Sequence, residues 1–476
     1  MYSTNNQKKI DMIKKRQLSY NTVWRWHFYA GLFCIPFALW LSVTGSIYLF
    51  KPQIEAFIDQ PYSNLILTGP AASAKDQVNA ALATVPGSVL NAYELPQTPT
   101  SAVQILVGKD KQLERVYVHP QTLEILRSVP EDERLMKIIF HLHGDLLAGD
   151  TGSYIVELAA SWMVVLIITG LFLWWPRNST GLAGIVYPRL SSGGRTFWRD
   201  IHSVTGLWIA FFVLFLIISG LPWAKSWGSM LKEVRKFNQT TEVKQDWTTG
   251  RSSELAERQA NNTPAPSMPK AEHNGHEGHH MSNPTVLIDY TLLNQIVALV
   301  DVQKLEYPVL ISPPNKAGAN WSAKSDTPNR PLRVNLKLDP NTADIVERKE
   351  FSQRPLLDRI IGVGVAAHEG QLFGWFNQFL GVFTALGVFL LGVSSVVMWW
   401  GRRPAGTLGA PRTINKPKLP LYMGIIICAL GVFLPLLGAS LIMILILEFT
   451  LLSRVSSISK FLDRKSSCRE RVSSPV

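Results

Sequence analysis

Two histidines occupy matching positions in two apolar segments of the sequence. His27 and His202 each follow a Trp-Arg pair, and each has a Gly-Leu pair beginning four residues later. A Ser/Thr-Gly pair comes next in both segments, and its glycine lies 18 residues after the histidine. A histidine in a membrane segment is costly without a partner, so it is a candidate for function. Because neutral imidazole is a common axial ligand of haem iron, this pair predicts a haem site.

His143 and His368 form a second pair. The stretches HGDLLAG and HEGQLFG share the pattern H-x-x-x-L-x-G, and each histidine precedes a tryptophan pair by 31 residues. Two pairs at repeat-related positions predict two haems of the b type, each clamped by imidazoles from facing helices. Glycines that follow His27 and His202 would let the macrocycle approach the backbone. They are Gly31, Gly45, Gly206 and Gly220. The arginines predicted to bind the haem propionates are Arg25 and Arg199.

The histidines also have simpler interpretations. A lone interfacial histidine often serves as an amphipathic anchor or makes an ordinary hydrogen bond. Zinc fits less well than haem, because it prefers three or four protein ligands and each pair offers two. His141 competes with His143, but two residues along a helix rotate by about 200°, so both cannot bind one iron from the same face. The repeat aligns His143 with His368, which leaves His141 to support the site or face the substrate.

Two further motifs have plain interpretations. The stretch HNGHEGHH could bind a transition metal weakly through His273, His276, His279 and His280. It lies within a polar segment, residues 239–283, and a linker that happens to be rich in histidine is the preferred interpretation. The tryptophan pairs at 174–175 and 399–400 are typical of aromatic anchors at a membrane interface, with packing against haem as a second possibility.

The composition is that of a membrane protein. Apolar residues make up 47% of the chain and charged residues only 17%, which differs from an ordinary soluble domain. Five uncharged runs approach or exceed the roughly 20 residues that a membrane-spanning helix needs. They cover residues 28–50, 158–176, 203–224, 370–401 and 419–447. The last run contains Pro435, so it is predicted either to cross once or to form a hairpin.

The net charge of +12 does not indicate nucleic acid, because the basic residues flank the apolar runs. Residues 1–25 are basic, and the loops 177–197 and 401–418 contain arginine and lysine without any acid. By the positive-inside rule the N-terminus and both loops are cytoplasmic. Residues 51–140 and 225–366 then lie outside, which in a bacterium is the periplasm. We therefore expect a multi-pass protein of the bacterial inner membrane.

The order of span, outer domain and span occurs twice, which is typical of membrane proteins with internal repeats. The two similar stretches VYVHPQTLEIL and LKLDPNTADIV each predict a strand, a turn and a second strand. The fold class predicted is an α-helical integral membrane protein: four core transmembrane helices in two tandem repeats, a C-terminal hydrophobic segment, and two small α/β outer domains. Helices are expected over 74–83 and 292–302, and strands over 88–94, 102–107, 115–119, 123–127, 309–311, 332–338 and 345–349.

The predicted boundaries follow from these patterns. They are a basic N-terminus (1–23), the first span (24–50), the first outer domain (51–140), the second span (141–176), a loop (177–197), the third span (198–224), the second outer domain with its linker (225–366), the fourth span (367–400), a loop (401–418), the C-terminal segment or hairpin (419–452) and a tail (453–476).

The chain resembles the PepSY-associated transmembrane proteins, a group that includes iron-regulated membrane proteins and ferric-siderophore reductases. The resemblance covers most of residues 20–450. It rests on W-R-x-H-x-x-x-G-L from Trp24, W-R-D-I-H-x-x-x-G-L from Trp198, the two H-x-x-x-L-x-G stretches and TGLFLWWPR ending at Arg177. It implies PepSY-like outer domains and a core with two haems. His27, His202, His143 and His368 match the positions expected to hold them.

The resemblance also implies electron delivery across the membrane to ferric iron held outside. The expected function is thus a di-haem ferric-siderophore reductase, with a ferric siderophore or another ferric chelate as substrate. Its electron donor would be a quinol or a flavoprotein, its surroundings membrane lipid, and nucleic acid is not an expected partner. Two alternatives remain: a PepSY-type scaffold or regulator that binds a peptide or protease, and a transporter of iron or its chelate.

Overall fold

The structure is a computed structural model that describes residues 2–109, 112–176, 181–237, 290–316, 318–411, 421–452, 455, 461 and 462. The chain forms two compact units. We call the first, made of Met1–Ile47, His141–Arg235 and Phe379–Val476, the helical unit. The second, made of Tyr48–Phe140 and Lys236–Gln378, is the sheet unit. Arg177 and the four histidines of HNGHEGHH lie outside the described residues.

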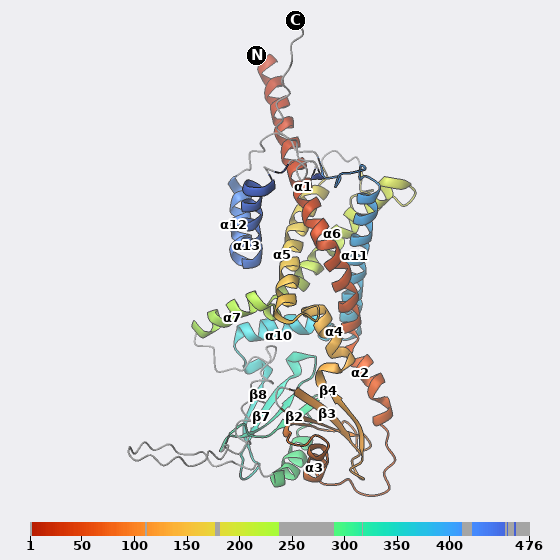
Figure 1. Cartoon of the computed structure of the whole chain (residues 1–476), viewed down its shortest axis with the longest axis vertical. Coiled ribbons are helices and arrows are strands. Elements are labelled where there is room, and N and C mark those ends of the chain that lie inside the picture. The colour runs from red at the N-terminus through yellow and green to blue at the C-terminus, as the bar shows by residue number, and fades with distance from the viewer. Residues whose placement is uncertain are drawn as a thin grey trace, which may run out of the picture. The chain divides into compact units, whose positions relative to one another are not determined.

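Four long apolar helices dominate the helical unit (Figure 1). They are α1 (Tyr2–Leu49), α5 (Gly149–Trp174), α6 (Gly194–Gly220) and α11 (Trp375–Trp400). Each contains at least 26 residues that are apolar enough to cross a membrane, over Tyr20–Leu49, Gly149–Trp174, Gly194–Trp223 and Trp375–Trp400. The prediction of a helical membrane protein is therefore confirmed, and the described residues contain four helices that are long and apolar enough to span a membrane. The tandem repeat itself stays a prediction.

Two of the predicted segments are interrupted by turns. The segment 141–176 contains the end of α4 (Leu135–Gly144) and the start of α5. Leu146, Leu147 and Gly149 between them have positive φ, which ends a right-handed helix. Gly370 and Gly374 separate α10 (Leu356–His368) from α11 in the same way. As a result, His143 and His368 lie near the ends of short helices that precede the spans.

The C-terminal apolar run forms two short helices that lie side by side (Figure 1). They are α12 (Leu421–Phe433) and α13 (Pro435–Leu447), and a π-helical turn, Glu448–Leu452, follows. Pro435 begins the second helix, where its missing N–H costs nothing. Gly431 and Gly438 allow the close approach, because a Cβ on Gly438 would lie 2.6 Å from the Gly431 carbonyl oxygen. Neither helix is among the four candidate spans of the described residues.

The sheet unit contains one antiparallel sheet of eight strands in the order β4-β3-β2-β1-β5-β6-β7-β8. Its strands are β1 (Val89–Glu94), β2 (Val103–Lys109), β3 (Gln112–Val118), β4 (Ile125–Pro130), β5 (Val309–Ser312), β6 (Trp321–Ser325), β7 (Val334–Leu338) and β8 (Ile345–Glu350). Tyr93 and Glu94 of β1 pair with Ile311 and Leu310 of β5. The strands predicted for two outer domains therefore belong to a single sheet.

Two helices pack against this sheet and complete its core. The predicted helices at 74–83 and 292–302 are confirmed as α3 (Ala74–Thr84) and α9 (Leu293–Val302). Val78 and Ile296 are fully buried against strand residues such as Ile105, Ile311 and Trp321. Burial of each such side chain contributes about 1.5–3 kcal/mol, so the two halves of the sheet stabilise one shared core.

The remaining elements are short. They are α2 (Lys51–Asp59), α7 (Lys225–Phe237) and the 3-10 turns Gln60–Tyr62, Glu131–Glu133, Leu221–Trp223, Tyr290–Leu292, Arg330–Leu332 and Phe351–Gln353.

Glu157 fixes the start of α7 from the middle of the helical unit. Its carboxylate is almost completely buried, and it accepts hydrogen bonds from the backbone N–H groups of Ser226 (2.8 Å) and Trp227 (3.1 Å). These N–H groups lie in the first turn of α7, where no intrahelical partner exists. Glu157 thus replaces the side-chain cap that α7 would otherwise need.

We expect Glu157→Leu to destabilise the start of α7 by about 2 kcal/mol, because two backbone donors lose a charged acceptor. Limited trypsin digestion of the full chain measures this, through faster cleavage after Lys225. Glu157→Gln, which keeps one acceptor oxygen, is the control and should be cleaved at an intermediate rate. Equal rates for Leu and wild type would show that the cap is not needed.

Candidate functional site

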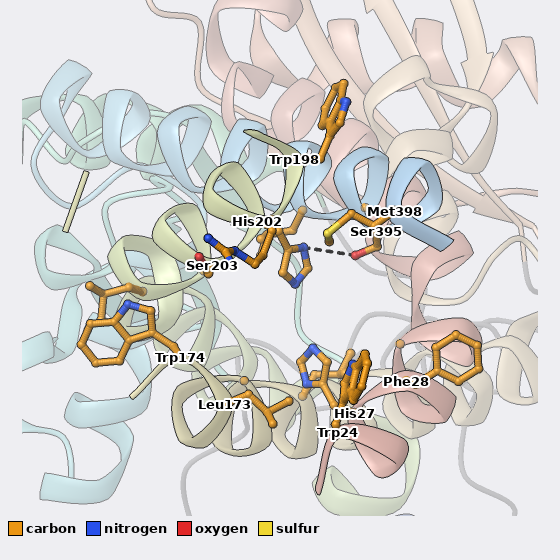
Figure 2. Close-up of a pocket in the computed structure, with 18 of the residues that line it drawn as sticks. Trp24, His27, Phe28, Leu173, Trp174, Trp198, His202, Ser203, Ser395 and Met398 are labelled. Atoms are coloured by element: carbon orange, nitrogen blue, oxygen red, sulfur yellow. Dashed lines mark hydrogen bonds between the residues drawn. The ribbon is translucent and has the colours of Figure 1, made fainter. Parts of the chain in front are cut away.

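The structure brings His27 of α1 and His202 of α6 together. Their ring centroids lie 6.2 Å apart and their planes are nearly perpendicular, at 86°. Figure 2 shows the two imidazoles pointing toward one another. The two residues are 175 positions apart in the sequence, so only the packing of two separate helices can produce this pair.

The two rings line a large cavity within the helical unit. Its volume is about 1380 Å³, which exceeds the roughly 300–1,000 Å³ of ordinary small-molecule sites. Its wall is mainly apolar and aromatic, with Trp24, Phe28, Trp174 and Trp198 among the residues drawn in Figure 2. Gly31 and Gly206, which the sequence predicted beside the cofactor, also line the cavity.

A hydroxyl group sets the orientation of the His27 ring. Nδ1 of His27 lies 2.9 Å from Oγ1 of Thr169 on α5. Thr169 donates its only hydroxyl hydrogen to the carbonyl oxygen of Val165, at 2.6 Å. Because a carbonyl oxygen only accepts, the Nδ1–H of His27 must be the donor to Thr169. This tautomer leaves the lone pair on Nε2, the nitrogen that a metal would bind.

His202 is held in an equivalent way from α11. Its Nδ1 lies 3.1 Å from Oγ of Ser394 and 3.2 Å from Oγ of Ser395. Ser394 is completely buried and donates its hydrogen to the carbonyl oxygen of Leu391. Ser394 can therefore only accept from an Nδ1–H of His202, whereas the hydroxyl of Ser395 can either accept from Nδ1 or donate to it. Among the described residues, none hydrogen-bonds Nε2 of either ring.

The pair has the dimensions of a bis-imidazole iron site. With an N–metal bond of about 2.0 Å on each side, two imidazoles that bind one ion from opposite sides have centroids roughly 6 Å apart. The measured separation is 6.2 Å. Among the described residues, no group of three or more His, Cys, Asp or Glu could hold a bare metal ion. Two imidazoles in a large apolar cavity therefore fit a haem, which brings the other four iron ligands itself.

His143 also has a hydroxyl partner for its Nδ1, but it lies in another part of the helical unit. Its Nδ1 lies 3.0 Å from Oγ1 of Thr44, and Thr44 donates to the carbonyl oxygen of Trp40. Gly45 leaves room for the ring, since a Cβ there would lie 3.0 Å from Cε1 of His143. His368 ends α10 in the sheet unit. The pairing of His143 with His368 stays a prediction.

His141 differs from the other histidines of the helical unit. Its Nδ1 lies 2.7 Å from a carboxylate oxygen of Asp145, one turn along the same helical segment. His141 therefore has a carboxylate partner close by along the chain, whereas the partners of His27, His143 and His202 are hydroxyl groups from other helices.

The arginines predicted to meet propionates have other partners. Arg25 is not among the described residues that line the cavity, and its guanidinium donates to the carbonyl oxygens of Pro411 (2.7 Å) and Leu462 (3.0 Å). Arg199 lines the cavity but donates to Asp200, at 2.8 Å. Arg189 binds the same carboxylate, at 2.7 Å, and this hydrogen bond raises the pKa of Arg189 above its ordinary value.

The comparison with known families is decisive for the class of protein. A family model described as the PepSY-associated TM region matches residues 24–402. The chain belongs to this family. The match includes all four candidate spans from Trp24 onward and all four histidines of the two predicted pairs. Among the curated proteins, none matches the chain significantly.

The tryptophan pairs of this PepSY-family chain divide into two roles. Trp174 and Trp399 line the cavity, and their indole N–H groups donate to the carbonyl oxygens of Ile185 and Leu408, each at 2.9 Å. Their neighbours Trp175 and Trp400 are exposed, as expected of aromatic anchors at a membrane interface. The first tryptophan of each pair thus holds the loop that follows its helix.

The hydroxyl partners of the histidines were not predicted from the sequence. Thr169 and Ser394 each lie 26 residues after a predicted histidine, His143 and His368. This equal spacing is the signal that could have revealed them. The Thr44-Gly45 pair was noted only as a small-residue feature, while the structure shows that its threonine contacts a histidine.

We expect Thr169→Val to weaken haem binding at the His27 site by about 10–100-fold, the usual cost of losing a residue that orients a metal ligand. Valine keeps the shape but removes the acceptor for Nδ1–H, so the ring can rotate or change tautomer. Titration of the haem-free full chain with haem measures the effect. Thr169→Ser, which keeps the acceptor, should bind like wild type. A Val variant with unchanged affinity would show that the hydroxyl does not position His27.

Proposed function

We propose that this PepSY-family membrane protein is a haem-dependent oxidoreductase that transfers single electrons across the membrane to a ferric chelate. The observation that carries the proposal is the His27–His202 pair, whose spacing and tautomers suit two axial ligands of one iron. The large apolar cavity around the pair supports it further. A haem bound there would supply a one-electron couple tuned by its protein surroundings.

The chain's own residues would act as a rigid holder. His27 and His202 would hold the haem iron, and Thr169 and Ser394 would favour the tautomer of each ring that leaves Nε2 able to ligate. The aromatic wall would exclude water and lower the local dielectric, which favours a stable iron site. Because all four residues lie on helices, little rearrangement would accompany a change of redox state.

A second haem on His143 and His368 would complete the path. The hydrocarbon core of a membrane is about 30 Å thick, so one cofactor cannot reach both surfaces. The support of His143 by Thr44 repeats the support of His27 by Thr169, which favours the same role for both. By the charge rule, the end of the spans that carries Arg195 and Arg402 would face the cytoplasm and its electron donor. The sheet unit would then meet the ferric chelate in the periplasm.

The chemistry at the outer side is a one-electron reduction. Ferric iron in the chelate would gain one electron and become ferrous, and a haem held by the chain's histidines would supply that electron. Ferrous iron is a softer ion than ferric iron, so a hard-oxygen chelate holds it less tightly and releases it.

The test is a spectrum and a single turnover of the purified full chain. We expect a reducible b-type absorption spectrum and two haems per chain. Addition of a ferric trihydroxamate to the anaerobically reduced protein should reoxidise it, with one ferrous ion trapped per electron. The gallium(III) trihydroxamate has the same shape but cannot be reduced, and it should cause no reoxidation. A folded but colourless preparation would contradict the proposal and favour a scaffold role.

A further inference from the structure

The end of the cavity where α6 begins and α11 ends is strongly basic. Its lining includes Arg189, Arg195, Arg199 and Arg402, and no Asp or Glu is among the described lining residues. Basic residues near the ends of spans are expected from the charge rule, so their presence alone indicates topology. What distinguishes this end is how the four charges are partnered.

One buried carboxylate pairs with two of these four arginines. Asp200 is completely buried, and it accepts hydrogen bonds from both Arg189 (2.7 Å) and Arg199 (2.8 Å). Asp200 is therefore already shared between two guanidinium groups. It holds the loop that contains Arg189 to the start of α6, which is a structural role.

Arg195 and Arg402 have no such partner. No carboxylate of the described residues lies within ion-pair distance of either guanidinium. Arg402 is half-buried, with its guanidinium over the rings of Trp24 (5.2 Å) and Phe28 (5.4 Å). Burial, and repulsion by the charge of Arg195, both lower the pKa of Arg402. Arg195 is exposed to solvent, so the cost falls on the half-buried charge of Arg402, which is unfavourable beside an apolar cavity unless a bound anion neutralises it.

The geometry points to Arg195 and Arg402 as an anion-binding site at the mouth of the cavity, built for two carboxylates. A guanidinium presents a planar fork that matches a carboxylate in two parallel hydrogen bonds. The aromatic rings under Arg402 hold its fork in place without using its N–H donors. This inference rests on the proposed function, because the carboxylates are those of the haem propionates. It moves the predicted propionate contacts from Arg25 and Arg199 to Arg195 and Arg402.

A lipid phosphate offers the same negative charge as a propionate, so the experiment must separate these two sources. The full chain, produced without haem, is placed in phosphatidylcholine nanodiscs and titrated with haem or with haem dimethyl ester. The ester has the same ring and iron but lacks the two carboxylates. The variants are Arg195→Gln, Arg402→Gln and the double variant. Arg403→Gln is the matched control, because Arg403 is adjacent but is not among the described lining residues.

We expect each single substitution to weaken the binding of haem about tenfold, and the double variant to weaken it about a hundredfold. A loss of this size is typical when one charge-assisted hydrogen bond is removed by each substitution. Binding of the ester should be the same in all variants, which also shows that they are folded. Arg403→Gln should bind both ligands like wild type. An equal loss for haem and ester would overturn the inference, since the arginines would then act only on the protein.

A second arm uses nanodiscs that contain phosphatidylglycerol. If the arginines bind lipid phosphate instead, the anionic lipid will weaken haem binding in wild type but not in the double variant, and the ester will bind like haem. That result would overturn the propionate assignment while the proposed function stands. If loss of His27 changes the binding of neither haem nor the ester, the proposed function fails instead. The two failures are thus distinguishable.

Discussion

A His27→Ala protein should lose the haem proposed for the cavity while keeping the one proposed for His143 and His368. Removal of one of the two proposed imidazole ligands would leave His202 as the single histidine in a described wall that is mainly apolar. The loss in affinity should exceed the 10–100-fold cost of removing a residue that only orients a ligand. Quantitation of haem in the purified full chain, expected to fall from two per chain to one, measures this.

The matched variants make this result specific. His202→Ala should give the same loss, and the double variant should lose no more than either single one, because both rings are proposed to bind one iron. His119 is the control histidine. Its Nδ1 accepts the backbone N–H groups of Gln121 and Thr122 in a turn, and Asp339 accepts two N–H groups in the same way in its own turn. His119→Asp should therefore preserve both the turn and the haem content.

His143→Ala should remove the other haem and leave the first in place. If instead His27→Ala left both haems bound, the cavity pair would be a simple contact between two imidazoles. The perpendicular ring planes offer an independent readout. Perpendicular axial imidazoles bring two iron d orbitals to nearly equal energy, so the ferric protein should give a strongly anisotropic low-spin EPR signal that disappears in His27→Ala.

The pairing of His27 with His202 could be predicted because it depends on a repeat in the sequence. Equivalent positions in two similar segments tend to lie at equivalent depths in two packed helices. The partners Thr169 and Ser394 come from the other two helices, and no local pattern around His27 or His202 indicates them. Their equal spacing from His143 and His368 becomes informative only once the helices are known to pack together.

The roles of the arginines could not be predicted from charge alone. Arg195, Arg199 and Arg402 are equivalent in a sequence pattern, because each is a basic residue near the end of a span. Only the buried position of Asp200 separates Arg199 from the other two. Ion pairing depends on a few ångströms of side-chain placement, which the sequence does not specify.

The strands of the sheet could likewise be predicted only in part from the sequence. Most strands were predictable from alternation of apolar residues, but β6 was missed. Its sequence, WSAKS, has one large apolar side chain, Trp321, and only the small Ala323 joins it in the hydrophobic core. The turn before α5 was missed because Leu146 and Leu147 are apolar residues that adopt positive φ, which composition does not indicate. The joining of the two halves through β1 and β5 depends on backbone pairing between distant strands.

Arg115→Met should produce the largest loss of stability in the sheet unit. Arg115 of β3 is only 5% exposed, and its guanidinium pairs with Glu94 of β1 and Glu131 and donates to Gln104 of β2. Burial alone would lower the pKa of Arg115, but the charges of the two glutamates raise it well above its ordinary value. The guanidinium thus stays charged and links three strands and the turn after β4.

Methionine fills similar volume but leaves Glu94 half-buried, with no other ion pair among the described residues. Breaking a buried pair in this way costs about 3–5 kcal/mol. Hydrogen exchange of β1–β3 amides in the full chain measures it, and a loss of that size speeds exchange by at least about a hundredfold. Lys337→Met on β7 is the control, because its pair with Glu347 is exposed and is worth about 0–1 kcal/mol.

The combined variant Arg115→Met with Glu94→Gln shows whether the loss of stability comes from the unpaired buried charge of Glu94 or from the loss of the Arg115 side chain itself. Because the neutral amide no longer carries a buried negative charge, exchange in the combined variant should be slower than in Arg115→Met alone. If Glu94→Gln gives no recovery, the cost comes from lost packing of the long arginine side chain. If Arg115→Met exchanges no faster than Lys337→Met, the buried network does not stabilise the sheet, and the core around Val78 and Ile105 alone determines its stability.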